Sequence, residues 1–256
     1  MCIKIAKASG RAIQIQKYSS PTNFTSFFKT KICDLFLNLD MSLVYLREID
    51  SQTKFAIWRI EESDDDLMSK LQLDEREKAI LGSFHIGKRR LHWLATRVLL
   101  RTLLNTSRYI ECPSDPNGKP YLANFPQKIS LSHSFEYAAA MISTKGEVGI
   151  DMEIINTKVE RIQHKFLKPE ELAFITRGEN QYEQLYACWC AKEAIYKLQG
   201  NAGVSFLNNM TIQPFNYQTQ GILKLELDSN QKKHNYDVYY EKFNEYMLAY
   251  AVEQGL

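Results

Sequence analysis

Residues 146–154 read Gly-Glu-Val-Gly-Ile-Asp-Met-Glu-Ile, a stretch that combines strand-forming residues with closely spaced acids. Side chains two residues apart lie on the same face of an extended strand. Ile150 and Met152 are therefore expected on one face, and Asp151 and Glu153 on the other. Two carboxylates side by side on a strand repel each other unless water, a cation or a basic group screens them.

This acidic pair suits a hard divalent cation. Mg²⁺ uses few carboxylate ligands and completes its shell with waters and substrate phosphates. An ordinary charged strand edge that faces solvent is the alternative, because short acidic patterns are common. The pair by itself leaves both interpretations open.

Working outward from this strand, the pattern predicts further strands and helices in both directions. Alternating β-branched and aromatic residues indicate strands, and apolar residues at helical spacing indicate helices. Ser63 is the expected N-cap of a short helix. The expected strands begin near Met41 and span 54–60, 128–131, 138–143, 148–155, 222–227, 236–240 and 246–252; the expected helices span 63–71, 74–104 (interrupted near Gly82 and Gly87), 159–164, 168–176 and 182–199.

These elements predict an α+β protein of two similar lobes related by a pseudo-two-fold axis. Each half holds about three strands plus helices, so each lobe is expected to be a small, mostly antiparallel sheet with packed helices. The predicted division is an N-terminal lobe at 41–150 and a C-terminal lobe at 151–256. Residues 1–40 form an extension of doubtful order, in which lysines and arginines outnumber acids.

A second informative stretch, Trp189-Cys-Ala-Lys-Glu-Ala-Ile-Tyr-Lys-Leu198, lies on the expected helix 182–199. Its apolar residues form one stripe that packs on a core. Glu193 and Lys197 fall four residues apart on a neighbouring face, with Lys192 one step away. Such a helix can complete a metal site and bind phosphates, or it can carry an ordinary Glu–Lys surface pair.

Together the two stretches resemble a known family. VGIDME at 148–153 and WCAKEAIYK at 189–197 look like the (V/I)G(I/V)D-x-E and W-x-x-KEA-x-x-K signatures of the 4′-phosphopantetheinyl transferases. Asn117-Gly-Lys-Pro-Tyr121 and Ser130-Leu-Ser-His-Ser134 resemble two further elements of that family. The resemblance runs from about residue 54 to the C-terminus. The length suggests the two-lobed, surfactin-synthetase-activating (Sfp-type) branch, a monomer with its active site in the cleft between the lobes.

The resemblance implies a reaction and a metal site. The 4′-phosphopantetheine group of coenzyme A would be transferred to a serine of an apo acyl or peptidyl carrier protein, with release of 3′,5′-ADP. Asp151, Glu153 and Glu193 would be the Mg²⁺ ligands, with the metal offsetting phosphate charge. Glu193 or a metal-bound water would deprotonate the serine. Lys192 and Lys197 would hold the phosphates.

The resemblance also implies a set of coenzyme A ligands. His133 and Ser132 resemble the phosphate-contacting end of a strand, although a lone histidine is more often structural. Arg90 and Arg97 lie on the expected helix 74–104, and arginine binds phosphate bidentately. The same two arginines also fit a basic helix face that is exposed to solvent. Lys119 and Pro120 resemble the loop beside the adenine, although the same residues fit a plain tight turn. The implied coenzyme A ligands are Arg90, Arg97, Lys119, Pro120, Ser132, His133, Lys192 and Lys197.

Composition limits the competing classes. The formal net charge of +2 is too small to indicate bulk nucleic-acid binding. The basic helix at 88–101 nevertheless leaves a nucleic-acid-binding module as one alternative. A Mg²⁺-dependent phosphohydrolase acting on a pyrophosphate is another. The five cysteines form no CxxC pair, which favours a reducing cytoplasm. No apolar stretch is long enough to span a bilayer, so no membrane partner is expected.

Overall fold

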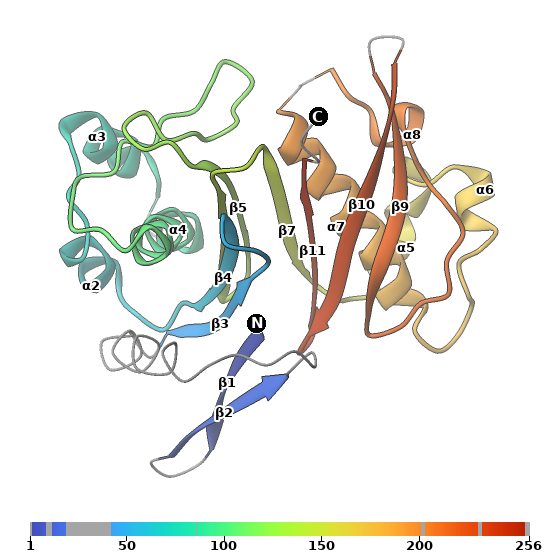
Figure 1. Ribbon diagram of the computed structural model, residues 1–256, viewed down its shortest axis with the longest axis horizontal. Coiled ribbons are helices and arrows are strands. Elements are labelled where there is room, and N and C mark those ends of the chain that lie inside the picture. Colours follow the sequence, from blue (N-terminus) through green and yellow to red (C-terminus); the bar gives the residue numbers. More distant parts are fainter. Residues whose placement is uncertain are drawn as a thin grey trace.

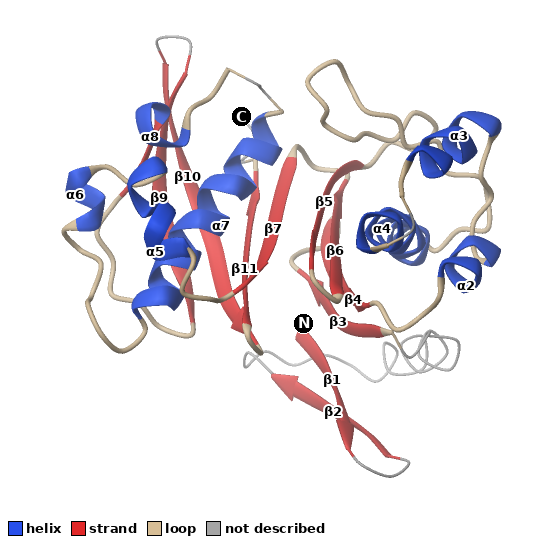
Figure 2. Cartoon of the chain, turned by 180° about the vertical axis from the view of Figure 1, so that it is seen from behind, coloured by secondary structure: helices blue, strands red, loops and turns tan. Residues whose placement is uncertain are grey.

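Two lobes lie side by side, each an antiparallel sheet with a long helix packed against it (Figure 1). The computed structural model describes residues 42–85, 87–200, 203–229 and 232–253, together with the backbone of two strands at 2–8 and 12–18. The two sheets face each other and the helices lie outside them (Figure 2). This arrangement confirms the predicted α+β fold of two lobes.

The sheet of the first lobe has the strand order β2-β1-β3-β4-β6-β5, with antiparallel pairing throughout. β1 joins it through three paired positions opposite residues 45–47 of β3. Apart from β1 and β2, the order of residues 1–40 lies outside the described residues. The strands are β1 (Cys2–Ala8), β2 (Ala12–Tyr18), β3 (Leu43–Glu48), β4 (Thr53–Arg59), β5 (Lys128–Ser134) and β6 (Tyr137–Ser143).

The helices of the first lobe are α2 (Asp64–Ser69), α3 (Glu75–Ser83) and α4 (Lys88–Leu104). Ser63 is the N-cap of α2, as predicted, in a capping box with Asp66. The expected long helix is split into α3 and α4. Gly87 at the break has φ +146°, which side-chain-bearing residues rarely adopt.

The second lobe has a five-stranded sheet of order β7-β11-β10-β9-β8, again antiparallel. Its first strand, β7, starts at Val148, just before the predicted lobe boundary at residue 150. The elements are β7 (Val148–Ile154), β8 (Met210–Ile212), β9 (Gln220–Ser229), β10 (Lys232–Phe243), β11 (Tyr246–Val252), α5 (Val159–Ile162), the 3₁₀ turn η1 (Gln163–Lys165), α6 (Pro169–Leu172), α7 (Gln181–Gln199) and α8 (Phe206–Asn209).

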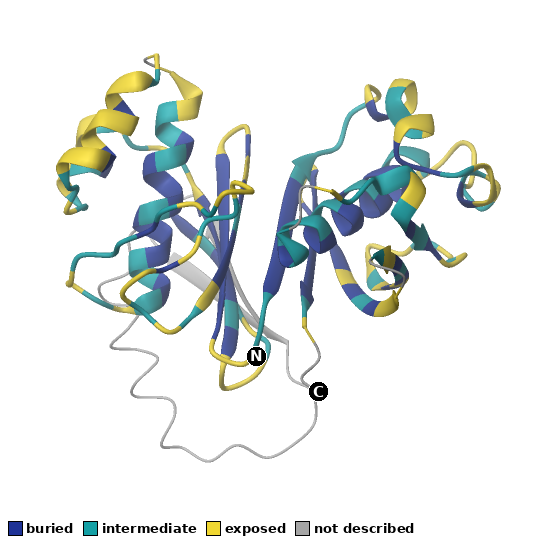
Figure 3. Ribbon diagram, turned by 90° about the horizontal axis from the view of Figure 1, so that it is seen from above, coloured by how far each residue is buried: buried dark blue, intermediate teal, exposed yellow. Residues whose placement is uncertain are grey.

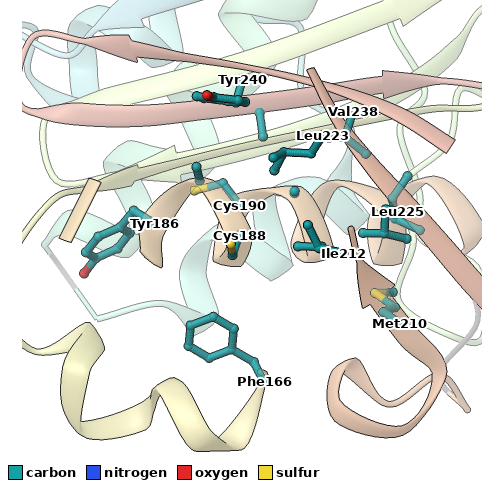
Figure 4. Close-up of a cluster of buried hydrophobic side chains, with 14 of the residues drawn as sticks. Phe166, Tyr186, Cys188, Cys190, Met210, Ile212, Leu223, Leu225, Val238 and Tyr240 are labelled. Atoms are coloured by element: carbon teal, nitrogen blue, oxygen red, sulfur yellow. The ribbon is translucent and has the colours of Figure 1, made fainter. Parts of the chain in front are cut away.

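Helix α7 packs very closely on β7, and Gly149 makes this approach possible. A Cβ added at Gly149 would lie 1.8 Å from the carbonyl oxygen of Ala194. The apolar side of α7, including Cys188 and Cys190, fills the core of this lobe together with Leu223 and Val238 of the sheet (Figure 4). The glycine therefore fixes the distance between the acidic strand and the helix that carries Glu193.

The two sheets share an apolar core of their own. Buried side chains of β3, β4 and β6 meet those of β7, β10 and β11, and the strands between the lobes are among the most buried parts of the chain (Figure 3). A largely buried ion pair between Arg47 and Glu241, with nitrogen and oxygen 2.5 Å apart, links β3 to β10. The relative position of the lobes is thus set by packing on both sides.

The sequence missed some elements. β1, β2, β8 and α8 were not predicted, and the count of three strands per half was too low. The expected helix 168–176 reduces to the single turn of α6. No helix in the described part of the chain combines the length and apolar character needed to cross a membrane.

Candidate active site between the lobes

Asp151 lies at the centre of a polar cluster on the face of β7 that meets α7. Its side chain is almost fully buried, with 3% of its surface exposed. Oδ1 accepts hydrogen bonds from the Lys197 ammonium at 2.7 Å and from the Ser132 hydroxyl at 2.8 Å. Oδ2 is buried without a hydrogen-bond partner among the described residues. A buried carboxylate oxygen with no partner is costly, so Oδ2 has an unused capacity to bind a ligand.

Glu153 and Glu193 lie within electrostatic range of Asp151. Burial raises the pKa of Glu153 to about 7, and the negative charge of Asp151 adds to this shift. The pKa of Glu193 is raised to about 7 for the same two reasons. These carboxyl groups therefore exchange protons near neutral pH, which matches the range useful for a general base.

The three acids that the sequence suggested as metal ligands are thus brought to one site. Over the described part of the chain, however, no three His, Cys, Asp or Glu side chains lie close enough together to hold a metal ion. Coulomb repulsion keeps unscreened carboxylates apart, and Lys197 already screens one oxygen of Asp151. The structure shows an acidic cluster and not a formed metal centre.

His133 lies beside this cluster, at the end of β5. Its pKa is lowered to about 4, first by burial and then by the nearby charges of His92 and Lys197. The imidazole is therefore neutral at physiological pH, with one nitrogen able to donate a hydrogen bond and one able to accept. The position fits the predicted contact between His133 and a phosphate.

Lys192 lies away from the Asp151 cluster, and its position contradicts the predicted role at the phosphates. Its side chain is fully buried beneath α7. The ammonium pairs with Glu171 at 2.8 Å and donates to the carbonyl oxygens of Phe166, Phe206 and Met210. Four partners satisfy a group that has only three protons. Lys192 acts here as an internal anchor that joins α7 to the segments around α6 and α8.

Two arginines of α4 also have internal partners in place of the predicted exposure to coenzyme A. Arg90 pairs with Asp64 at 2.5 Å and donates to the carbonyl oxygen of Leu81, so it ties together α2, α3 and α4. The guanidinium of Arg97 stacks on the Trp93 ring, 3.4 Å from its centroid, and donates to the Trp93 carbonyl. Burial lowers the pKa of Arg97. The contacts of Arg90 occupy its guanidinium, whereas the Nε of Arg97 is buried without a hydrogen-bond partner among the described residues.

Lys119 and Pro120 line a pocket of about 530 Å³ that both lobes form. The walls come from the loop after residue 115, the start of β5, Glu147, and the end of α7 at Gly200. The Lys119 ammonium is bound by the Glu147 carboxylate and by the Leu198 carbonyl, both at 2.6 Å. The loop therefore contacts the end of α7, and the charge of the Lys119 ammonium is paired with that of Glu147.

Ser132 does not fit its predicted role as a coenzyme A ligand. The side chain is buried, and its hydroxyl donates to Asp151 and accepts from the backbone nitrogen of Met152 at 3.2 Å. The sequence analysis also missed His92 on α4. Its ring stacks on His133 with centroids 4.3 Å apart, and its Nε2 lies 2.6 Å from the carbonyl oxygen of Phe135. Nothing in the spacing of α4 separates this histidine from other half-buried helix residues.

Comparison with known proteins supports a family assignment. A family model described as the 4′-phosphopantetheinyl transferase superfamily matches residues 147–251. A 4′-phosphopantetheinyl transferase named AcpT from Salmonella typhi is 32% identical over 146 residues, which cover 53% of this chain and 72% of that protein. The chain belongs to the 4′-phosphopantetheinyl transferase superfamily. The enzyme type is accordingly that of a 4′-phosphopantetheinyl transferase.

Other transferases of this name agree. AcpT of Escherichia coli is 34% identical over 124 residues, covering 45% of this chain and 61% of that protein. A putative 4′-phosphopantetheinyl transferase from Synechocystis is 30% identical over 132 residues, covering 46% of this chain and 53% of that protein. The superfamily match begins at residue 147, just before β7, and ends in β11, so it includes Asp151, Glu193 and Lys197. The strand with His133 and helix α4 lie outside it.

Proposed function

We propose that this chain transfers the 4′-phosphopantetheine group of coenzyme A to a serine of an apo carrier protein. The observation that supports this most directly is the Asp151–Lys197 pair at 2.7 Å beside two glutamates whose pKa values are about 7. The cluster combines a fixed cation with a proton acceptor that works near neutral pH. Membership of the superfamily supplies the reaction class.

The residues that bind the donor differ from the original expectation. Lys197 is 27% exposed and is oriented by Asp151, so it is the cation best placed to contact a phosphate of coenzyme A. The neutral His133 adds one hydrogen bond. Lys119 and Pro120 line the pocket at the end of α7, which we propose as the place of the adenine. Arg90, Lys192 and Ser132 have no part in this proposal, because internal contacts occupy them. Arg97 is left out because its guanidinium is stacked on the Trp93 ring.

The chemical step exchanges one phosphorus–oxygen bond for another. The serine oxygen of the carrier bonds to the phosphorus of the phosphopantetheine group, and the bond to 3′,5′-ADP breaks. Glu193 accepts the serine proton, for which a pKa near 7 is suitable. Lys197 offsets the negative charge on the departing phosphate, an effect that is strong where water is excluded.

Mg²⁺ belongs to the proposal because of the chemistry of the donor set, although the three carboxylates would have to move closer together than they lie in this structure. The cluster offers carboxylate oxygens, and the unpartnered Oδ2 of Asp151 leaves one buried ligand position open. When bound, the ion would offset phosphate charge. Asp151, Glu153 and Glu193 are the residues that would hold it.

Further details are also part of the proposal. The carrier is an acyl or peptidyl carrier protein, and the enzyme acts as a cytoplasmic monomer of the two-lobed, Sfp-type branch. The single-chain arrangement supports this choice, because residues of both lobes line the pocket at Lys119 and surround Asp151. The proposed lobes remain 41–150 and 151–256.

Intact-protein mass spectrometry tests the function. Apo carrier protein is incubated with this enzyme, coenzyme A and Mg²⁺, and a mass gain of one phosphopantetheine is expected. Loss of the gain in EDTA would support the metal assignment, whereas full activity in EDTA would refute it. Free 4′-phosphopantetheine in place of modified carrier would indicate the phosphohydrolase. No reaction with a panel of acyl and peptidyl carriers would contradict the proposed transfer.

A further inference from the structure

A row of serine hydroxyls joins the edge strands of the two lobes. Ser130, Ser132 and Ser134 alternate along β5, so they share one face of the strand. Their Oγ atoms accept hydrogen bonds from the backbone nitrogens of residues 150, 152 and 154 of β7, at 3.0, 3.2 and 3.2 Å. Each partner lies 20 residues further along the chain, so the two strands run parallel. Serine side chains thus accept the hydrogen bonds that backbone carbonyl oxygens accept in an ordinary sheet.

Two of these serines make a second contact that the third does not. The hydroxyl of Ser132 donates to Oδ1 of Asp151 at 2.8 Å, and that of Ser134 donates to Oε2 of Glu153 at 2.8 Å. A hydroxyl has one proton and two lone pairs, so donation to a carboxylate and acceptance from a backbone nitrogen are compatible. Among the described residues, the Ser130 hydroxyl has only the backbone contact.

We propose that Ser132 and Ser134 are positioning residues for the acids of β7, so that the first lobe sets the geometry of carboxylates carried by the second. The catalytic meaning of this inference rests on the function proposed above. Each hydroxyl accepts a hydrogen bond from a backbone nitrogen of β7 and donates its proton to a carboxylate of the same strand. The acid side chain is thereby held in one rotamer against the repulsion of its neighbours.

The burial of the serines supports positioning over ligand binding. Ser132 and Ser134 are each 5% exposed, and the lone proton of each hydroxyl is used by a carboxylate. Neither retains a donor for a phosphate. On Asp151, the Ser132 hydroxyl and the Lys197 ammonium share Oδ1 and leave Oδ2 open. The pattern determines which oxygen of the acid faces the site.

Three alanine variants separate positioning from simple attachment of the strands. Ser130→Ala, Ser132→Ala and Ser134→Ala each remove one acceptor of a β7 backbone nitrogen, so a purely structural role predicts similar losses of melting temperature and equal activity. We expect larger melting losses in Ser132→Ala and Ser134→Ala, which each break two hydrogen bonds, and unequal activity. Ser132→Ala and Ser134→Ala should lose about 10- to 100-fold in kcat, with the KM for coenzyme A within about twofold, while Ser130→Ala stays near wild type.

Equal kcat values in the three variants would overturn the proposal. If Ser132→Ala fails to fold, Ser134→Ala decides, because its carboxylate partner is less buried. Ser134→Thr keeps the hydroxyl and should recover most of the lost kcat.

A measurement without substrate keeps this inference distinct from the proposed function. Unfolding by urea in EDTA is compared for Ser132→Ala, Asp151→Ala and the double variant, with Ser130→Ala and Asp151→Ala as the matched cycle. We expect non-additive losses in the first cycle and additive losses in the second. Additive losses in both would refute the contact. If the wild-type protein had no transferase activity, the proposed function would be refuted. The coupling between Ser132 and Asp151 in unfolding stability would still be valid.

Discussion

Helices α4 and α7 hold comparable places in their lobes but use their charged side chains differently. Each is long and packs its apolar side on its own sheet. In α4, Arg90 and Arg97 bind Asp64 and Trp93 inside the first lobe. In α7, Glu193 and Lys197 reach the acids of β7.

The difference follows from what packs beside each helix. On α4, Arg90 is held by α2 and Arg101 by the loop after residue 105. The corresponding side of α7 faces the acidic strand and the other lobe. The two helices therefore differ in the partners of their charged side chains: Arg90 is held by a helix of its own lobe, whereas Lys197 lies beside the carboxylates of β7. Four substitutions or conditions test this contrast.

The largest effect is expected from Glu193→Gln. The amide keeps the shape of the side chain but cannot accept a proton, so kcat should fall by about 10²- to 10⁴-fold. Glu183→Gln is the matched control, because Glu183 lies on the same helix and pairs with Lys242 at 3.1 Å away from the site. Transfer rates of the two variants and their circular dichroism are compared. A Glu193→Gln enzyme as active as the control would remove Glu193 from the chemistry.

The two lysines of α7 should separate stability from activity. Lys192→Met leaves the Glu171 carboxylate buried without its partner, which costs about 3–5 kcal/mol of unfolding free energy. Lys197→Met should cost less stability than Lys192→Met, because its ammonium is partly exposed and Asp151 keeps its hydrogen bond from Ser132, but it should lower kcat about 100-fold. Urea unfolding and initial rates measure both. If Lys192→Met lost activity without losing stability, Lys192 would be shown to contact the phosphates after all.

The raised pKa values predict a pH dependence of stability in the absence of metal. The folded pKa of Glu193, about 7, exceeds the unfolded value near 4.3. The folded state therefore binds more protons, and this contribution to stability is complete below about pH 4.3 and lost as pH rises through 7. His133, whose pKa is lowered, changes stability in the opposite sense below about pH 6.5.

The comparison of wild type with Glu193→Gln isolates the glutamate. In EDTA, wild-type stability should fall relative to the variant between pH 5 and 8, by about 1.4 kcal/mol for each unit of pKa shift at most. Mg²⁺ at pH 8 should restore the wild type and have less effect on the variant. Parallel pH curves would show that the Glu193 pKa is not raised.

The smallest kinetic effect is expected from Arg97→Lys. Lysine keeps the positive charge but loses the planar stack on Trp93, so the melting temperature should fall by a few degrees. The KM for coenzyme A should change less than twofold. A tenfold rise in KM at unchanged stability would show that Arg97 reaches the nucleotide and that α4 resembles α7 after all.

Local sequence patterns predicted much of the fold. Alternation at 148–155 located β7, and helical spacing at 182–199 located α7 to within one residue at the start. The short β8 and α8 were missed, since a strand of three residues carries too little periodicity. The length of α6 was overestimated. The helical pattern at 168–176 is not enough to form a helix of that length, because short helices depend on tertiary packing.

The sequence by itself determined which residue types were available: two acids on one strand face, and a glutamate with a lysine four residues later on a helix. Spacing along one element fixes these relations, because backbone geometry does. Only the tertiary structure decided that Lys192 is an internal anchor while Lys197 contacts Asp151, and that three serines of one lobe bind the acidic strand of the other. Burial and partner choice depend on contacts between segments far apart in the chain, and local periodicity contains no information about them.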